Sequence, residues 1–205
     1  MFCPAKGDGS VVRHLIAAGA LGAAALALSS CATLNEEQCQ VVDWQQLGQS
    51  DGAQGRPSTH VARHQEACTS FGITVDAAAW QSGWESGIQS YCTPSNGLSV
   101  GLSGGVNRNA CPADLAARFN EAYRVGDAVH DARARRDETQ REIDRLIREL
   151  SAATDDAERT RIQVELELAR NRLSTAQADV ARTEREADLY RLRLTRAAAS
   201  PALAQ

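Results

Sequence analysis

The sequence lacks an apolar run that is long enough to cross a membrane as a permanent helix. Its longest apolar run, Leu15 to Leu28, consists largely of Ala, Gly and Leu, whereas a membrane-spanning helix needs about 20 predominantly apolar residues. Basic residues precede this run and small residues follow it, an order that is typical of secretory signal peptides. We therefore predict that residues 1–30 form a cleaved signal peptide rather than a transmembrane anchor.

Lysine is almost absent, because Lys6 is the only one and arginine supplies the remaining positive charge. Acidic residues outnumber basic ones, and the formal net charge is −4. Nucleic-acid-binding proteins usually present a basic patch or stripe, so we expect no nucleic-acid partner. The sequence also lacks a Gly-Lys-Ser/Thr phosphate-binding motif and any clear Ser-His-Asp or Cys-His constellation. We therefore expect neither a cofactor nor enzymatic activity.

The segment Leu28-Ser29-Ser30-Cys31 follows the apolar run. It resembles the bacterial lipobox, in which the cysteine is lipidated and becomes the first residue of the mature chain. The resemblance implies that Cys31 carries acyl chains such as palmitate, and two or more chains give stable membrane anchoring. Ala32 rather than Asp follows, which by resemblance to the sorting rule of didermal bacteria favours the outer membrane, facing the periplasm. The alternative is an ordinary signal peptide with a chance cysteine.

Cysteine pairs of the form Cys-x-x-Cys are absent, and zinc sites usually depend on such close pairs. The mature chain has four cysteines besides Cys31, and an even number in an exported chain indicates disulfides: these are Cys39, Cys68, Cys92 and Cys111. Sequence alone allows three pairings. We favour Cys39–Cys68 and Cys92–Cys111, because each pair then brackets one structural unit. A four-cysteine zinc site is the alternative.

Residues 31–127 are rich in cysteine and glycine and are predicted to form a compact domain. Periodic apolar residues predict helices over 39–51, 57–68 and 76–92. Two of these segments contain Gly-x-x-x-Gly beside a tryptophan, a spacing that puts two bare patches one turn apart on one helix face. We expect the glycines to permit close packing, and their recurrence indicates a weak internal duplication. The motifs are Trp44, Gly48 and Gly52, and Trp80, Gly83 and Gly87.

The segment after Cys92 is predicted to contain β structure. Pro94 to Gly97 has the composition of a turn, and residues 98–107 alternate apolar with small residues, which predicts a short β-hairpin around Ser103-Gly104-Gly105. The expected fold class is therefore mainly α, with a small disulfide-stapled α+β domain followed by a long antiparallel helical hairpin.

The same region resembles the pattern of a bacterial lipoprotein family known as domain of unknown function 2799. The positions that carry the resemblance are Cys39, Asp43-Trp44, Gly48, Asp51-Gly52, Gly55, His64, Cys68, Gly83, Gly87, Tyr91-Cys92-x-Pro94, Asn96-Gly97, Gly101, Gly104 and Cys111-Pro112. The resemblance covers about residues 35–125. It implies an envelope lipoprotein, and it implies no activity, cofactor or catalytic residue.

Residues 128–196 are predicted to form the helical hairpin, with a break at 151–156. Asp155 and Glu158 have the spacing of a capping motif for the second helix. That helix carries a heptad seam in alternating steps of four and three: Ile162, Leu166, Ala169, Leu173, Ala176, Val180, Thr183, Ala187, Tyr190 and Leu194. Arg136 and Thr139 weaken the seam of the first arm. We therefore expect a protein or peptidoglycan partner, or a second copy, along the hairpin. Residues 197–205 are expected to be a disordered tail.

Two sets of residues are candidates for chemistry. His60 and His64 lie one helical turn apart and can bind zinc, with Asp51 or Glu66 as a further ligand. Asp51 and Glu85 occupy the two glycine motifs and can form a carboxylate pair for glycan cleavage. The alternative to a structural or interaction lipoprotein is accordingly an envelope enzyme, either a cell-wall glycan hydrolase or a zinc-dependent hydrolase. We favour a binding protein without metal, because neither set completes a known motif.

Overall fold

The computed structural model describes residues 33–199, which divide into two compact units. The small unit contains the described residues up to Val42 together with Ala62–Val75, and the large unit contains Asp43–Val61 and the chain from Asp76 onward. The predicted signal peptide and Cys31 lie outside the described residues, as does most of the predicted tail. No helix within residues 33–199 combines the length and apolar character that a membrane-spanning helix requires.

The small unit is built from α1 (Glu36–Val41) and α3 (Val61–Thr69). The first residue of α3, Val61, is assigned to the large unit. Asn35 caps α1 in a reciprocal capping box with Gln38, which satisfies two backbone N–H groups that the first turn leaves free. The predicted disulfide Cys39–Cys68 joins the two helices, with both cysteines buried.

The predicted helix over 39–51 is in fact two helices. The break lies at Val42 and Asp43, where the backbone is extended and the Asp43 side chain accepts a hydrogen bond from the backbone N–H of Gln46. Asp is among the strongest N-cap residues, so it starts a new helix, α2 (Trp44–Ala53). The 3₁₀ turn η1 (Ser58–His60) then leads into α3.

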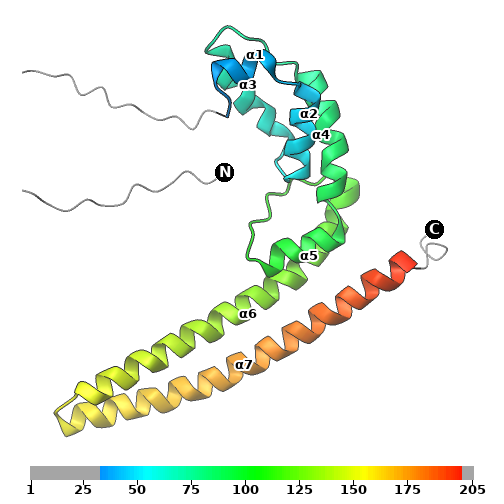
Figure 1. Ribbon diagram of the computed structural model, residues 1–205. Helices are drawn as coiled ribbons and strands as arrows, with labels where there is room; N and C mark the ends of the chain where they lie inside the picture. Colours follow the sequence, from blue (N-terminus) through cyan, green and yellow to red (C-terminus); the bar gives the residue numbers. More distant parts are fainter. Residues whose placement is uncertain (1–32, 200–205) are drawn as a thin grey trace, which may run out of the picture. The chain divides into compact units, whose positions relative to one another are not determined.

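In the large unit, α2 and α4 (Ala77–Tyr91) form a parallel pair (Figure 1). Gly83 approaches the backbone of Gln45, and Gly87, one turn later, approaches the backbone of Gln49. From the other helix, Gly48 and Gly52 approach the backbone of α4 in the same way. The glycines therefore let the two backbones touch directly, as predicted, and the two similar segments are packed against each other.

The predicted β-hairpin is wrong, because the segment forms helix α5 (Pro94–Leu102) and residues 33–199 contain no strand. The Thr93 hydroxyl accepts a hydrogen bond from the backbone N–H of Asn96, and Pro94 occupies the first turn, where its missing N–H costs nothing. The alternating pattern arises because Gly97 and Gly101 pack closely on a second helix. Gly97 lies against the backbone of Phe119 and Gly101 against that of Tyr123.

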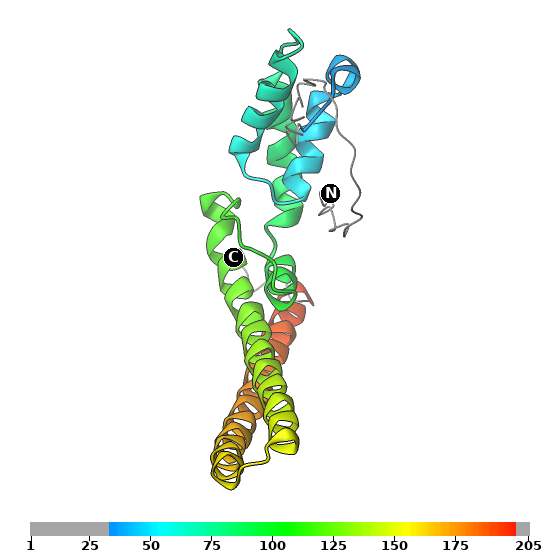
Figure 2. The same cartoon turned by 90° about the vertical axis from the view of Figure 1, so that its left-hand side faces the viewer.

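The long helices α6 (Ala113–Ala152) and α7 (Asp156–Ala199) form an antiparallel hairpin, seen side by side in Figures 1 and 2. The turn lies within the predicted break, and Asp155 accepts a hydrogen bond from the backbone N–H of Glu158 as expected. Near the turn, the seam buries Ile143, Leu146, Ile162, Leu166 and Ala169. The helix α6 begins before residue 128, so it belongs both to the predicted compact domain and to the predicted arm.

The contact between α2 and α4 leads to a first prediction. Gly83→Ala should destabilise the large unit, because the added methyl group would collide with the backbone around Gln45 and Gln49. Overpacking of this kind costs about 1–3 kcal/mol, occasionally more, and this exceeds the gain of about 1 kcal/mol that Ala offers over Gly within a helix. All three tryptophans lie in α2 and α4, so urea unfolding followed by tryptophan fluorescence reports on this contact.

Ser86→Ala is the matched control, because Ser86 is exposed on the same helix. Its midpoint should stay close to that of the wild type. Equal midpoints for Gly83→Ala and the wild type would contradict direct backbone contact.

Candidate functional site

Asp51 is the buried charged centre of the pair formed by α2 and α4. Its side chain is 4% exposed and accepts a hydrogen bond of 3.0 Å from the indole N–H of Trp80. The Arg56 Nε atom lies 3.1 Å from the other carboxylate oxygen, without the geometry of a hydrogen bond. Burying a carboxylate is costly unless it is paired and hydrogen-bonded, and this network supplies both requirements.

The loop that follows α2 is held by the same network. The indole N–H of Trp84 donates a hydrogen bond of 2.8 Å to the backbone carbonyl of Arg56. Next to it, Gly55 has φ +67° and lies against the ring of Tyr91, where a side chain would collide. Asp51 and Arg56 thus connect the end of α2 to the tryptophans of α4, which assigns Asp51 a structural role.

Glu85, the other predicted carboxylate, lies in a different environment. It is exposed on α4 and its Oε1 accepts a hydrogen bond of 3.0 Å from the side-chain amide of Gln81. A glycosidase needs two carboxylates on either side of the scissile bond, one of them with a raised pKa. Here one carboxylate is buried within a structural network and the other is a surface group, so the predicted pair does not line a common cleft.

The predicted metal ligands are divided between the two units. In the large unit, a carboxylate oxygen of Asp51 and a ring nitrogen of the half-buried His60 lie within 4.8 Å of each other. In the small unit, Nδ1 of the buried His64 lies 2.9 Å from the Thr33 hydroxyl, and Glu66 is exposed on α3. The large unit thus brings together two of the four predicted ligands, and Arg56 competes with a cation for Asp51.

The Tyr-Cys-x-Pro-x-Asn-Gly motif builds the junction between α4 and α5. The side-chain amide of Asn96 donates a hydrogen bond of 2.8 Å to the backbone carbonyl of Tyr91, at the end of α4. Cys92 forms the predicted disulfide with Cys111, just before α6. The motif therefore links three successive helices.

Tyr91 itself is anchored by packing on both sides. Its ring stacks on that of Phe119 from α6, with 5.3 Å between the ring centroids, and it also covers Gly55. This burial raises the pKa of the Tyr91 phenol above its usual value, although the charge of Arg108 lowers it in part. The phenol therefore stays neutral to a higher pH than a free tyrosine does, which suits a packing role.

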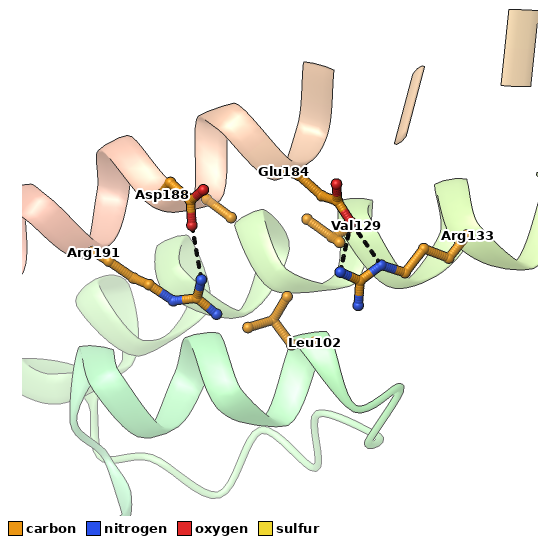
Figure 3. Close-up of a pocket in the computed structure, with 7 residues that line it drawn as sticks. Leu102, Val129, Arg133, Glu184, Asp188 and Arg191 are labelled. Carbon is orange, nitrogen blue, oxygen red and sulfur yellow. Dashed lines mark hydrogen bonds and ion pairs between the residues drawn. The ribbon is translucent and has the colours of Figure 1, made fainter. Parts of the chain in front are cut away.

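A pocket of about 360 Å³ lies where α5, α6 and α7 meet (Figure 3). Two ion pairs flank it, one from Arg133 to Glu184 at 2.6 Å and one from Arg191 to Asp188 at 2.9 Å. An apolar surface lies between these pairs, formed by Leu102, Val129 and Ala187. Exposed ion pairs contribute little stability, so the pocket marks a thinly covered part of the core.

The network around Asp51 leads to a second prediction. Asp51→Ala leaves the buried indole N–H of Trp80 without its acceptor, and an unsatisfied buried donor costs about 1–3 kcal/mol. Asp51→Asn keeps a side-chain acceptor for this indole and should lose less stability. Glu85→Ala is the control at the exposed carboxylate and should stay within about 0.5 kcal/mol of the wild type. Equal unfolding free energies for Asp51→Ala and Glu85→Ala would contradict the structural role of Asp51.

The comparisons with known proteins agree with the motif. A family model described as Protein of unknown function (DUF2799) matches residues 43–128, which covers α2, α4, α5 and the first part of α6. No curated protein and no solved structure matches the chain. Residues 43–128 therefore belong to the DUF2799 family, the family that the sequence motifs predicted.

Proposed function

We propose that the chain is a lipid-anchored lipoprotein of the cell envelope that acts as a structural or protein-interaction module, with acylated Cys31 as its anchor. The observation that carries this proposal is the pair of disulfides, Cys39–Cys68 and Cys92–Cys111, downstream of the lipobox. Disulfides form and persist in secreted and periplasmic compartments and are rare in the cytosol. Their presence therefore supports export.

The disulfides also supply stability that the domain needs. They close loops with sequence separations of 29 and 19 residues, and loops of this size correspond to about 3 kcal/mol each. The core around α4 is small, with Trp80, Trp84 and Ile88 as its largest buried members. A domain of this kind depends on an oxidising compartment to remain folded.

The hairpin supports an interaction role. Helices of 40 and 44 residues correspond to arms on the order of 60 Å at 1.5 Å per residue. The outward surfaces carry ion pairs in which the arginine precedes the acidic residue, such as Arg145–Glu149, and others in which it follows, such as Glu167–Arg170. A long, charged, two-helix arm presents a large surface for a protein or peptidoglycan partner, with the outer membrane as the proposed site of anchoring.

The geometry around the predicted carboxylates favours this binding role over hydrolysis. Asp51 is committed to Trp80 and Arg56, and Glu85 is a surface group.

The anchor is tested by Cys31→Ser. This variant should move from the membrane fraction to the soluble envelope fraction and should lose incorporation of labelled palmitate, because serine cannot form the thioether to diacylglycerol. Cys3→Ser is the control, since Cys3 lies within the predicted signal peptide, and it should behave as the wild type does. Retention of Cys31→Ser in the membrane fraction would refute the lipid anchor.

The outer-membrane assignment is tested separately by Ala32→Asp. By the didermal sorting rule, Asp after the lipidated cysteine should shift the protein from the outer to the inner membrane. Density-gradient separation of the two membranes, followed by immunodetection, measures this shift. An unchanged distribution would contradict the proposed sorting while leaving lipidation itself intact.

A further inference from the structure

The outward face of α7 carries most of the unexplained apolar surface of the hairpin. The exposed large hydrophobic residues of the described chain include Val164 at 58%, Leu168 at 54%, Leu189 at 61% and Leu192 at 52%. Side chains scattered singly over a surface need no explanation. These four, however, lie on one helix and recur at its heptad spacing, so they call for one.

The four residues belong to a single stripe on the side of α7 opposite the seam. Its members follow steps of four and three, and all are exposed: Val164, Leu168, Asn171, Thr175, Ala178, Arg182, Arg185, Leu189 and Leu192. We call this set the outer stripe. In a solvated coiled coil these positions are normally polar. The helix α7 therefore carries exposed large apolar residues at both ends of its outer face, in addition to the seam that α6 covers.

The outer stripe is symmetric about its centre. Val164 and Leu168 lie at one end and Leu189 and Leu192 at the other, at nearly equal distances from Ala178. Suppose that a second α7 runs antiparallel to the first and that the two Ala178 residues lie close together. Val164 and Leu168 of each helix would then lie opposite Leu192 and Leu189 of the other. The contact would extend over roughly 42 Å at 1.5 Å per residue.

The charges beside the stripe fit the same arrangement. In an antiparallel pair centred near Ala178, Glu165 faces Arg193 of the second copy and Arg172 faces Glu186, and twofold symmetry repeats both attractions. On the other flank Glu167 faces Asp188, and at the centre Asp179 faces Asp179 of the second copy. Glu167, Asp188 and Asp179 are already paired within their own helix, to Arg170, Arg191 and Arg182. Glu165 and Arg172 are likewise paired already, to Arg161 and to Glu142 of α6.

A parallel pair fits less well. It would bring Arg182 against Arg182 and Arg185 against Arg185 of the second copy, and like charges that face each other are destabilising. The antiparallel pair instead sets these arginines opposite Asn171 and Thr175.

A groove lies beside the outer stripe where the seam of the hairpin is weakest. Its volume is about 520 Å³, and its lining includes Leu168, Asn171 and Thr175 of the stripe as well as Thr139 of α6. In an antiparallel pair, Leu189 of the second copy lies opposite Leu168. The groove thus leaves room for an apolar side chain beside Leu168 and Ala176, with Arg135, Arg172 and Asp179 at its polar border. Insertion of such a knob into a hole is the packing mode by which coiled coils associate.

We propose that the outer stripe of α7 is a self-association surface, through which a second copy of this chain binds antiparallel with its centre near Ala178. The surface consists of described residues alone, so the inference does not depend on the lipid anchor.

The oligomeric state provides the first test. Sedimentation equilibrium of the full chain in density-matched detergent should give the mass of a dimer. Leu168→Glu and Leu189→Glu should each raise the dissociation constant about tenfold or more, as substitutions at interface anchors do. Ile147→Glu is the matched control, because Ile147 is 47% exposed on α6 and lies off the stripe. Its dissociation constant should not change, and circular dichroism should show equal helix content in all variants.

The register provides the second test. Glu165→Arg should weaken the dimer, because it places two arginines opposite each other. Its combination with Arg193→Glu should restore the dimer, because the two symmetry-related contacts between positions 165 and 193 again join opposite charges. In addition, Arg193→Lys introduces a lysine into a chain that has none after Lys6. A zero-length carbodiimide should link this lysine to Glu165 of the second copy. Within one helix these two positions are roughly 42 Å apart, so the link reports only an antiparallel contact between copies.

Three results would overturn the proposal. The first is a wild type that is monomeric at every accessible concentration. The second is a dimer that persists in both leucine variants, and the third is a crosslink that joins the two copies near residue 193 of each. Binding of a monomeric chain to phosphatidylethanolamine–phosphatidylglycerol vesicles, lost in Leu189→Glu, would assign the outer stripe to the membrane and would overturn it as well.

Discussion

Direct contact between helix backbones is the constraint on which the family domain, residues 43–128, depends. At Gly48, Gly52, Gly83 and Gly87, no side chain separates α2 from α4, and Gly97, Gly101 and Gly126 repeat the arrangement between α5 and α6. The chain has few large apolar residues, so a wider spacing would leave cavities that nothing in the sequence can fill. Close approach instead increases dispersion contacts without bulky side chains. The two tryptophans of α4 then cover the edge of the contact. Their indole N–H groups donate hydrogen bonds to the Asp51 carboxylate and to the backbone carbonyl of Arg56.

The parts of the fold that follow from periodicity could be predicted from the sequence. The seam of α7 was visible as an uninterrupted alternation of steps, and its members are buried or half-buried. The glycine motifs were visible because their spacing alone carries their meaning. The cysteine pairing was predicted because each pair brackets one structural unit. Helix α5 was missed because its glycines, which serve a close helix contact, produce the same alternation as a strand. The capping residues Thr93 and Pro94 were the signal that could have identified it.

The candidate site was less predictable than the fold. Asp51 was identified as a notable carboxylate, but its partners Arg56 and Trp80 come from a loop and another helix, and no local pattern connects them. The roles within Tyr-Cys-x-Pro-x-Asn-Gly are likewise tertiary, since Asn96 acts on the carbonyl of Tyr91 and Tyr91 acts on Phe119. A motif that appeared to mark a site is thus explained by the junction of three helices.

The hairpin differs from the family domain in what stabilises it. Its inner seam is well filled near the turn but contains Arg136 and Thr139 midway, where α6 offers no large apolar partner to α7. A two-helix hairpin of this length buries one face of each helix only, and most helical stability comes from such burial and not from propensity. The outer stripe is the surface through which α7 can bury more. An antiparallel second copy would cover the stripe and the adjoining groove together, and would therefore add apolar burial on a face of α7 that α6 leaves exposed.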